Sequence, residues 1–92
     1  MNSNMKMKTR VLVVGLGSIG QRHSRLLSER NDVDLYLCDT KEELRQQTIA
    51  SLVNPPMANY SVFSDAVIAK PDIVFVCVPN HLHVPIALEA IE

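Results

Sequence analysis

The sequence predicts an α/β fold, a doubly wound parallel sheet truncated after about four strands. Three observations support this prediction. Apolar runs suited to buried strands alternate with stretches of helical periodicity, a glycine-rich turn follows the first run, and an acidic residue ends the second. The element order is β-α-β-α-β-α-β-α, and right-handed crossovers then place ligands at the carboxyl ends of the strands.

Directly after the first apolar run, residues 11–14, three glycines follow at the spacing G-x-G-x-x-G. Gly15 permits a sharp turn, Gly17 lets the backbone approach a pyrophosphate, and Gly20 lets the helix pack closely on the strand. The helix that begins at Ser18 presents free N–H groups and the positive end of its dipole to an anion. Alone, this pattern also fits a tight strand-to-helix turn without a ligand.

The second apolar run, residues 33–38, ends at Asp39, where this kind of fold places an acidic residue. A carboxylate there accepts hydrogen bonds from the hydroxyls of an adenosine ribose and repels a 2′-phosphate. The sequence therefore predicts a Rossmann-type dinucleotide site and favours NAD, with NADP open because Lys41 offers a cation. Asp39 or Thr40 can also cap the next helix, and the two roles are compatible.

Residues 1–9 are polar and without periodicity, so we expect a flexible lead-in and a partial NAD(P)-binding domain over residues 10–92. The first helix is predicted over residues 18–30. Its inward face is expected to carry three apolar residues and a partly buried histidine: Ile19, His23, Leu26 and Leu27.

The remaining elements continue the alternation of helices and strands. We expect a helix over residues 41–53 with Leu44, Ile49 and Leu52 inward, a weak edge strand over 59–63, a short helix over 66–69, a strand over 72–78 and a helix from about residue 84. The run IVFVCV in the fourth strand has no polar position, so both of its faces are expected to be covered.

Composition narrows the class of protein. Hydrophobic residues make up 47% and charged residues 21%, as in an ordered globular domain, and the net charge of −1 gives no support for nucleic-acid binding. No membrane span or signal peptide is expected, because three glycines interrupt the first apolar stretch. Cys38 and Cys77 are expected on strands too far apart for a disulfide, which favours a reducing cytoplasm.

The chain resembles the glucose–fructose oxidoreductase and inositol dehydrogenase family over about residues 10–92. The resemblance rests on GLGSIGQRH after a valine-rich strand, on Asp39, and on KPDIVFVCVPNHLHVPIALEAIE with its P-N-x-x-H element. It implies that Pro79, Asn80 and His83 line the nicotinamide side of the cofactor site. It also implies a later Glu-Lys-Pro element and a second, substrate-binding domain, neither of which lies in these 92 residues, so we expect no catalytic residue in this chain.

The leading hypothesis is the cofactor-binding part of an oxidoreductase that moves a hydride between NAD(P) and a sugar, cyclitol or polyol. The alternative is a non-catalytic dinucleotide-binding sensor, and a methyltransferase is disfavoured by the spacing of Gly20. His81, His83 and Cys77 do not complete a metal site. The free edge of the fourth strand leads us to expect self-association, as a homo-oligomer. The predicted cofactor-binding residues are Gly15, Gly17, Ser18, Ile19, Gly20, Asp39, Thr40, Pro79, Asn80 and His83.

Overall fold

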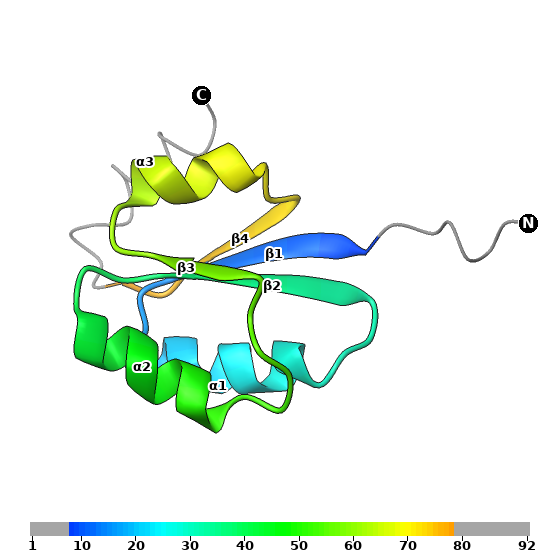
Figure 1. Ribbon diagram of the computed structural model, residues 1–92, viewed down its shortest axis with the longest axis horizontal. Coiled ribbons are helices and arrows are strands. Elements are labelled where there is room, and N and C mark those ends of the chain that lie inside the picture. Colours follow the sequence, from blue (N-terminus) through cyan, green and yellow to red (C-terminus); the bar gives the residue numbers. More distant parts are fainter. Residues whose placement is uncertain (1–7, 79–92) are drawn as a thin grey trace, which may run out of the picture.

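A computed structural model describes residues 8–78, which form a four-stranded parallel sheet covered by helices (Figure 1). The strand order is β3-β2-β1-β4, which confirms the predicted doubly wound arrangement. The elements are β1 (Thr9–Val14), α1 (Ser18–Ser28), β2 (Val33–Cys38), α2 (Glu42–Ser51), β3 (Ala58–Tyr60), α3 (Phe63–Ala66), the 3-10 helix η2 (Val67–Ala69) and β4 (Ile73–Val76).

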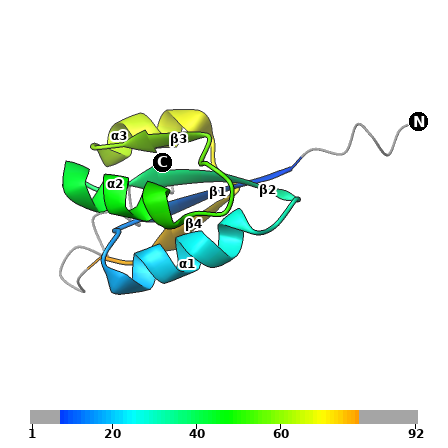
Figure 2. The ribbon, with the colours of Figure 1, turned by 60° about the horizontal axis from the view of Figure 1, so that its bottom comes forward.

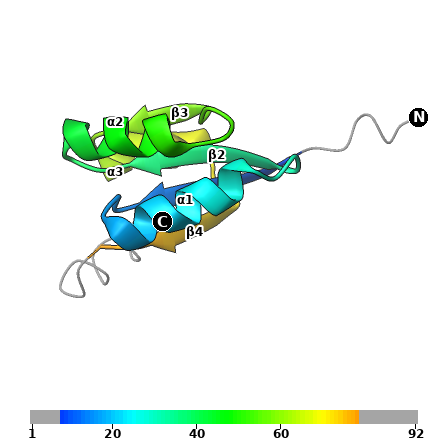
Figure 3. The same ribbon diagram turned by 90° about the horizontal axis from the view of Figure 1, so that it is seen from below.

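Helices lie on both faces of the sheet. α1 and α2 cover one face, whereas α3 and η2 lie on the other, as the two rotated views also show (Figures 2 and 3). β1 lies in the middle, so Val13 stands between Leu37 of β2 and Phe75 of β4. β2 pairs in parallel with one edge of β1 and β4 with the other, so neither edge of β1 is exposed to solvent.

Side chains of β1 alternate between two hydrophobic clusters, one on each face of the sheet. Leu12 and Val14 pack on the side of α3, and Val13 packs on the side of α1 and α2. Because both faces are covered, every position from residue 11 to residue 14 must be apolar. This explains the continuous valine-rich run in the sequence.

The predicted inward face of α1 is partly wrong. Ile19 and Leu26 are 64% and 56% exposed, and the residues buried against the sheet are Gly20, Ser24 and Ser28. Small side chains let the helix lie close to the sheet. The buried Ser24 hydroxyl has a hydrogen-bond partner there, because it donates to the carbonyl of Gly20 (2.7 Å).

Two other side chains of α1 behave as predicted. Leu27 packs against the core cluster on the α1 side of the sheet. His23 is partly buried, and its ring lies 5.3 Å from that of Phe75, centroid to centroid.

Several element ends differ by a few residues from those predicted. β1 begins at Thr9, inside the expected lead-in, because the Thr9 N–H bonds to the carbonyl of Asp32 (2.9 Å). β3 begins at Ala58 rather than residue 59, and the Met57 N–H already bonds to the carbonyl of Leu35 (2.8 Å). Phe63, expected in that strand, starts α3 instead. α1 and α2 are each shorter than predicted, and both end at a serine.

α2 packs as expected. Leu44, Ile49 and Leu52 contact the core cluster under α1 and α2. Thr48, which the sequence did not single out, is fully buried, and its hydroxyl donates to the carbonyl of Leu44 (2.7 Å). A polar side chain is tolerated there because its hydrogen bond is made within the helix.

The fourth strand is shorter and less buried than predicted. β4 runs from Ile73 to Val76, and Ile73 is 46% exposed while the other three residues are half-buried. β4 lies at one edge of the described sheet and pairs with β1 alone, so the described residues cover it incompletely.

Both cysteines of the chain lie within the described residues. Cys38 is buried, Cys77 is half-buried, and no disulfide joins them. No helix within residues 8–78 is long and apolar enough to cross a membrane.

Candidate dinucleotide-binding site

The turn after β1 needs glycine at its first position. Gly15 has a φ of +93°, a backbone conformation that residues other than glycine rarely adopt. A Cβ there would also lie 2.7 Å from Cγ1 of Val78 and 2.8 Å from the carbonyl carbon of Cys77. The Gly15 N–H bonds to the carbonyl of Cys38 (2.9 Å), which ties the turn to the end of β2.

α1 begins immediately after this turn. Gly17 is its N-cap, and the first intrahelical bond runs from the Gln21 N–H to the carbonyl of Gly17 (2.9 Å). The N–H groups of the three residues between them therefore precede the helical hydrogen-bond ladder and carry the positive end of the helix dipole. The Gln21 side chain donates to the carbonyl of Leu16 (3.0 Å) and holds the turn against the helix.

Gly17 and Gly20 have different surroundings. A Cβ at Gly17 would meet no atom within 4 Å, so open space lies beside the backbone there. A Cβ at Gly20 would overlap the carbonyl oxygen of Gly15. Gly20 is thus required for packing of helix on strand, whereas Gly17 leaves room for a ligand.

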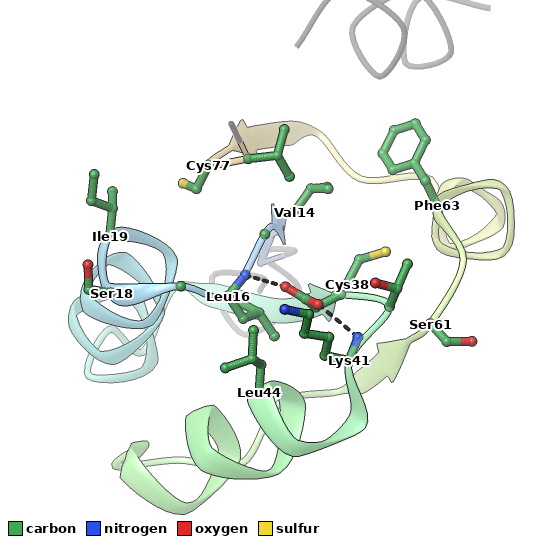
Figure 4. A pocket seen from close by; sticks show the side chains of 15 residues that line it. Val14, Leu16, Ser18, Ile19, Cys38, Lys41, Leu44, Ser61, Phe63 and Cys77 are labelled. Carbon is green, nitrogen blue, oxygen red and sulfur yellow. Dashed lines mark hydrogen bonds between the residues drawn. The ribbon is translucent and has the colours of Figure 1, made fainter. Parts of the chain in front are cut away.

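Asp39 joins the end of β2 to the glycine turn. Its Oδ2 accepts the N–H of Leu16 (2.8 Å), and its Oδ1 accepts the N–H of Lys41 (2.8 Å), the residue before α2 (Figure 4). A carboxylate has about four acceptor positions, so each oxygen keeps one for a further donor. The bond from Lys41 involves the N-cap residue of α2, so it is not a capping bond to the first turn. No side chain caps that helix.

These elements border a cleft of about 690 Å³ at the carboxyl edge of the sheet. Residues 15–19 form one wall and residues 38–41 another, while Ser61 and Phe63 lie across the cleft from Ser18 and Ile19 (Figure 4). The volume is in the range of small-molecule and cofactor sites, about 300–1,000 Å³. Apolar side chains with a few convergent polar groups are also typical of such sites.

A sequence model described as an oxidoreductase family with an NAD-binding Rossmann fold (GFO_IDH_MocA) matches residues 9–92. The chain belongs to this family. The resemblance inferred from the glycine turn, Asp39 and the P-N-x-x-H element is thereby confirmed, as is the expected cofactor, NAD.

The individual proteins that this chain resembles are named as dehydrogenases. The chain is 34% identical over 89 residues to D-glucoside 3-dehydrogenase of Escherichia coli (strain K12), covering 90% of this chain and 24% of that protein. It superposes with a TM-score of 0.77 and 21% identity on scyllo-inositol dehydrogenase from Lactobacillus casei with bound NAD(H) and scyllo-inositol, covering 91% of this chain and 25% of that one. For myo-inositol dehydrogenase from Corynebacterium glutamicum the values are 0.69 and 24%, covering 92% and 25%. The chain thus spans about a quarter of these relatives.

The fold brings most of the predicted cofactor-binding residues of this family member to one cleft. Gly15, Gly17, Ser18, Ile19, Asp39 and Thr40 line it, and Gly20 lies behind the turn as a packing residue. Pro79, Asn80 and His83 lie outside the described residues.

Sequence reasoning missed Ser61 and Phe63 as cleft residues. They follow β3, and the rule that ligands bind at the carboxyl ends of parallel strands was a signal that could have identified them. It also missed the bond from the Leu16 N–H to Asp39, for which a main-chain donor leaves no signal in the sequence.

Cys77 lies beside the glycine turn and lines the same cleft. Burial raises the pKa of its thiol, so the uncharged form is favoured and the sulfur is a poor nucleophile at neutral pH. Within residues 8–78 there is no cluster of three side chains able to bind a metal ion.

The residues present fit the adenosine diphosphate half of NAD. Open space at Gly17 and the start of α1 suit a pyrophosphate, which binds main-chain N–H groups at close approach. The remaining acceptor positions of Asp39 suit ribose hydroxyls. Leu44 and Phe63 supply apolar surface at the same cleft for a planar ring.

Proposed function

We propose that this chain is the NAD-binding part of an oxidoreductase that moves a hydride between the cofactor and a hydroxyl or keto carbon of a sugar, cyclitol or polyol. Family membership supports the redox class, and the named activities of the relatives support the substrate class. The cofactor, when bound, supplies hydride transfer, and the chain described here binds and orients it.

The observation that carries the proposal is that the glycine turn and Asp39 face one cleft and are bonded to each other. In this proposal Gly15 shapes the turn, and Gly17, Ser18 and Ile19 hold the pyrophosphate by main-chain N–H groups. Asp39 and Thr40 hold the adenosine ribose. Such a site needs no basic side chain, because the helix dipole and the N–H groups stabilise the negative charge.

The nicotinamide half of the site is proposed from the family resemblance. We assign Pro79, Asn80 and His83 to it, following the P-N-x-x-H element after β4. The fourth strand lies next to β1, so this segment follows a strand that ends at the same edge of the sheet as the glycine turn.

Titration calorimetry with NAD on wild-type chain and Gly17→Val tests the assignment. The wild type is expected to bind NAD, and the variant is expected to fold normally, because a Cβ at Gly17 would meet no atom within 4 Å. It should lose binding, because that space is where the pyrophosphate must approach. Normal NAD binding by folded Gly17→Val would overturn the phosphate-turn assignment.

Substrate class needs a separate assay on the protein that carries this domain. Incubation with NAD and a panel of sugars, cyclitols and polyols should give cofactor reduction with at least one of them. For the 92-residue chain alone we propose no turnover, since the described residues contain no acid–base group placed to orient a substrate hydroxyl. Reduction of NAD by this chain alone would contradict that part of the proposal.

We also propose a cytoplasmic location and self-association. Cys38 ends β2 and Cys77 follows β4, and β1 lies between these two strands, which supports the expectation that the two cysteines are too far apart for a disulfide. The half-exposed strand β4 lies at an edge of the described sheet, and such an edge pairs readily with another chain. Sedimentation of the chain as a stable monomer would exclude the second point.

A further inference from the structure

Arg45, on the first turns of α2, connects three elements at the adenosine end of the cleft. Its Nη1 donates to the main-chain carbonyl of Asp39 (2.7 Å), and its Nε donates to the side-chain oxygen of Asn59 on β3 (2.9 Å). Its own N–H bonds to the carbonyl of Lys41 (3.2 Å). One guanidinium thus ties the helix to the residue that follows β2 and to the neighbouring edge strand.

With the bond from Arg45, the N–H, the carbonyl and the carboxylate of Asp39 are all hydrogen-bonded. Its N–H bonds to the carbonyl of Tyr60 (3.0 Å), its carbonyl accepts from Arg45, and its carboxylate accepts the N–H groups of Leu16 and Lys41. Main chain and side chain are therefore both fixed. Of these partners, Arg45 alone acts through a side chain, so it can be replaced without altering the backbone.

We propose that Arg45 is a positioning residue for the carboxylate of Asp39 and thereby a determinant of the preference for NAD over NADP. This rests on the proposed function of Asp39 as the ribose-binding group. With the Asp39 carbonyl held, rotation of the following peptide is restricted, and the carboxylate stays within reach of the Leu16 and Lys41 N–H groups. A fixed carboxylate binds ribose hydroxyls with less loss of freedom and presents its charge to a 2′-phosphate.

A second effect of the same contacts is that two of the five N–H donors of the guanidinium are engaged within the chain. Arginine is the usual partner for a 2′-phosphate in this type of site. Here the two donors that bond to Asp39 and Asn59 are not available to a phosphate oxygen. Lysine has no planar fork and cannot reproduce both bonds in this geometry.

The test compares Arg45→Met, which keeps the aliphatic stem and removes the donors, with Arg45→Lys, Asn59→Ala and the control Arg25→Met on the exposed side of α1. For each full chain, calorimetry gives the dissociation constants for NAD and NADP. NMR of the cofactor-free chain gives the amide shifts and exchange rates of Leu16 and Lys41.

Arg45→Met is expected to weaken NAD binding about tenfold, which is the effect of losing one charge-assisted hydrogen bond. NADP binding should weaken less, so the two dissociation constants should become more similar. The amides of Leu16 and Lys41 should shift and exchange faster. Arg45→Lys should fall between Arg45→Met and wild type, and Arg25→Met should match wild type. Asn59→Ala should change the ratio in the same direction and by a smaller factor, with no added effect in the double variant with Arg45→Met.

Loss of affinity for both cofactors by the same factor would show a merely structural role and overturn the inference. Unmoved amides of Leu16 and Lys41 in folded Arg45→Met would do so as well. If Arg45→Met does not fold, Arg45→Lys and Asn59→Ala decide by the same two readouts. Failure of the wild type to bind NAD would instead overturn the proposed function, and the amide shifts would still judge the positioning role.

Discussion

β1 and β4 have similar sequences and different surroundings. β1 carries VLVV and β4 carries IVFV, and the two pair residue by residue from Val11 opposite Ile73 to Val14 opposite Val76. Every one of the four β1 residues is buried, and none of the four β4 residues is. A strand is buried by its neighbours, so an apolar run predicts a strand more securely than it predicts the cover over that strand.

The same contrast runs through α1. We call β1, β2 and the sheet-facing side of α1 the inner region. β4 and the solvent-facing side of α1, together with its exposed N-cap Gly17, form the outer region. Matched substitutions in the two regions, of the same residue type, test whether this division describes the energetics. The largest difference is expected at the glycines, the next between the strands and the smallest on the helix.

Gly20→Ala should be the most damaging substitution. Its Cβ would overlap the carbonyl oxygen of Gly15, which is main chain and cannot move aside, so the free energy of unfolding should fall by at least about 3 kcal/mol. Gly17→Ala, with open space at its Cβ, should lose less than about 1 kcal/mol. Urea unfolding followed by circular dichroism measures both, and equal stability of the two variants would contradict the close contact of helix and turn.

Val13→Ala and Val74→Ala compare the strands directly. Val13 is fully buried between β2 and β4, so its loss should lower the free energy of unfolding by about 2 kcal/mol. Val74 is half-buried, and its loss should cost about 1 kcal/mol or less. Equal losses in chemical denaturation would mean that β4 is as fully covered as β1, and the distinction between inner and outer region would fail there.

Leu27→Ala and Leu26→Ala compare the two sides of α1. Leu27 contacts the core and its truncation should cost about 1–2 kcal/mol, whereas Leu26 is exposed and its truncation should stay within about 0.5 kcal/mol. Thermal unfolding of both variants is the measurement. A loss at Leu26 as large as that at Leu27 would support the helix face that the sequence predicted.

Much of the fold could be predicted from the sequence because it depends on local pattern. The second strand was predicted with its observed bounds, residues 33–38, since both its run of apolar residues and its acidic end are visible in the sequence. The glycine spacing predicted the turn and the helix start. The face of α1 could not be predicted by hydrophobicity, because close approach at Gly20 leaves space only for small residues such as Ser24.

The candidate site also contains both residues that the sequence predicts and a residue that it does not. Gly17 and Asp39 were predicted as site residues because the glycine spacing and the acidic residue after the second apolar run are visible in the sequence. Arg45 was not, because its partners are a main-chain carbonyl and an amide on β3, and neither requires an arginine at any particular distance in the sequence. Contacts of this kind depend on how α2 lies against two strands, which becomes visible only in three dimensions.

The role assigned to Asp39 is tested most directly by the pair of dissociation constants for NAD and NADP, measured by titration calorimetry on the wild-type chain. We expect NAD to bind more tightly than NADP by about tenfold or more, because the fixed carboxylate of Asp39 accepts ribose hydroxyls and repels a 2′-phosphate. Asp39→Ala should narrow that difference. Equal or tighter binding of NADP by the wild type would contradict the assignment of Asp39 as the ribose-binding group.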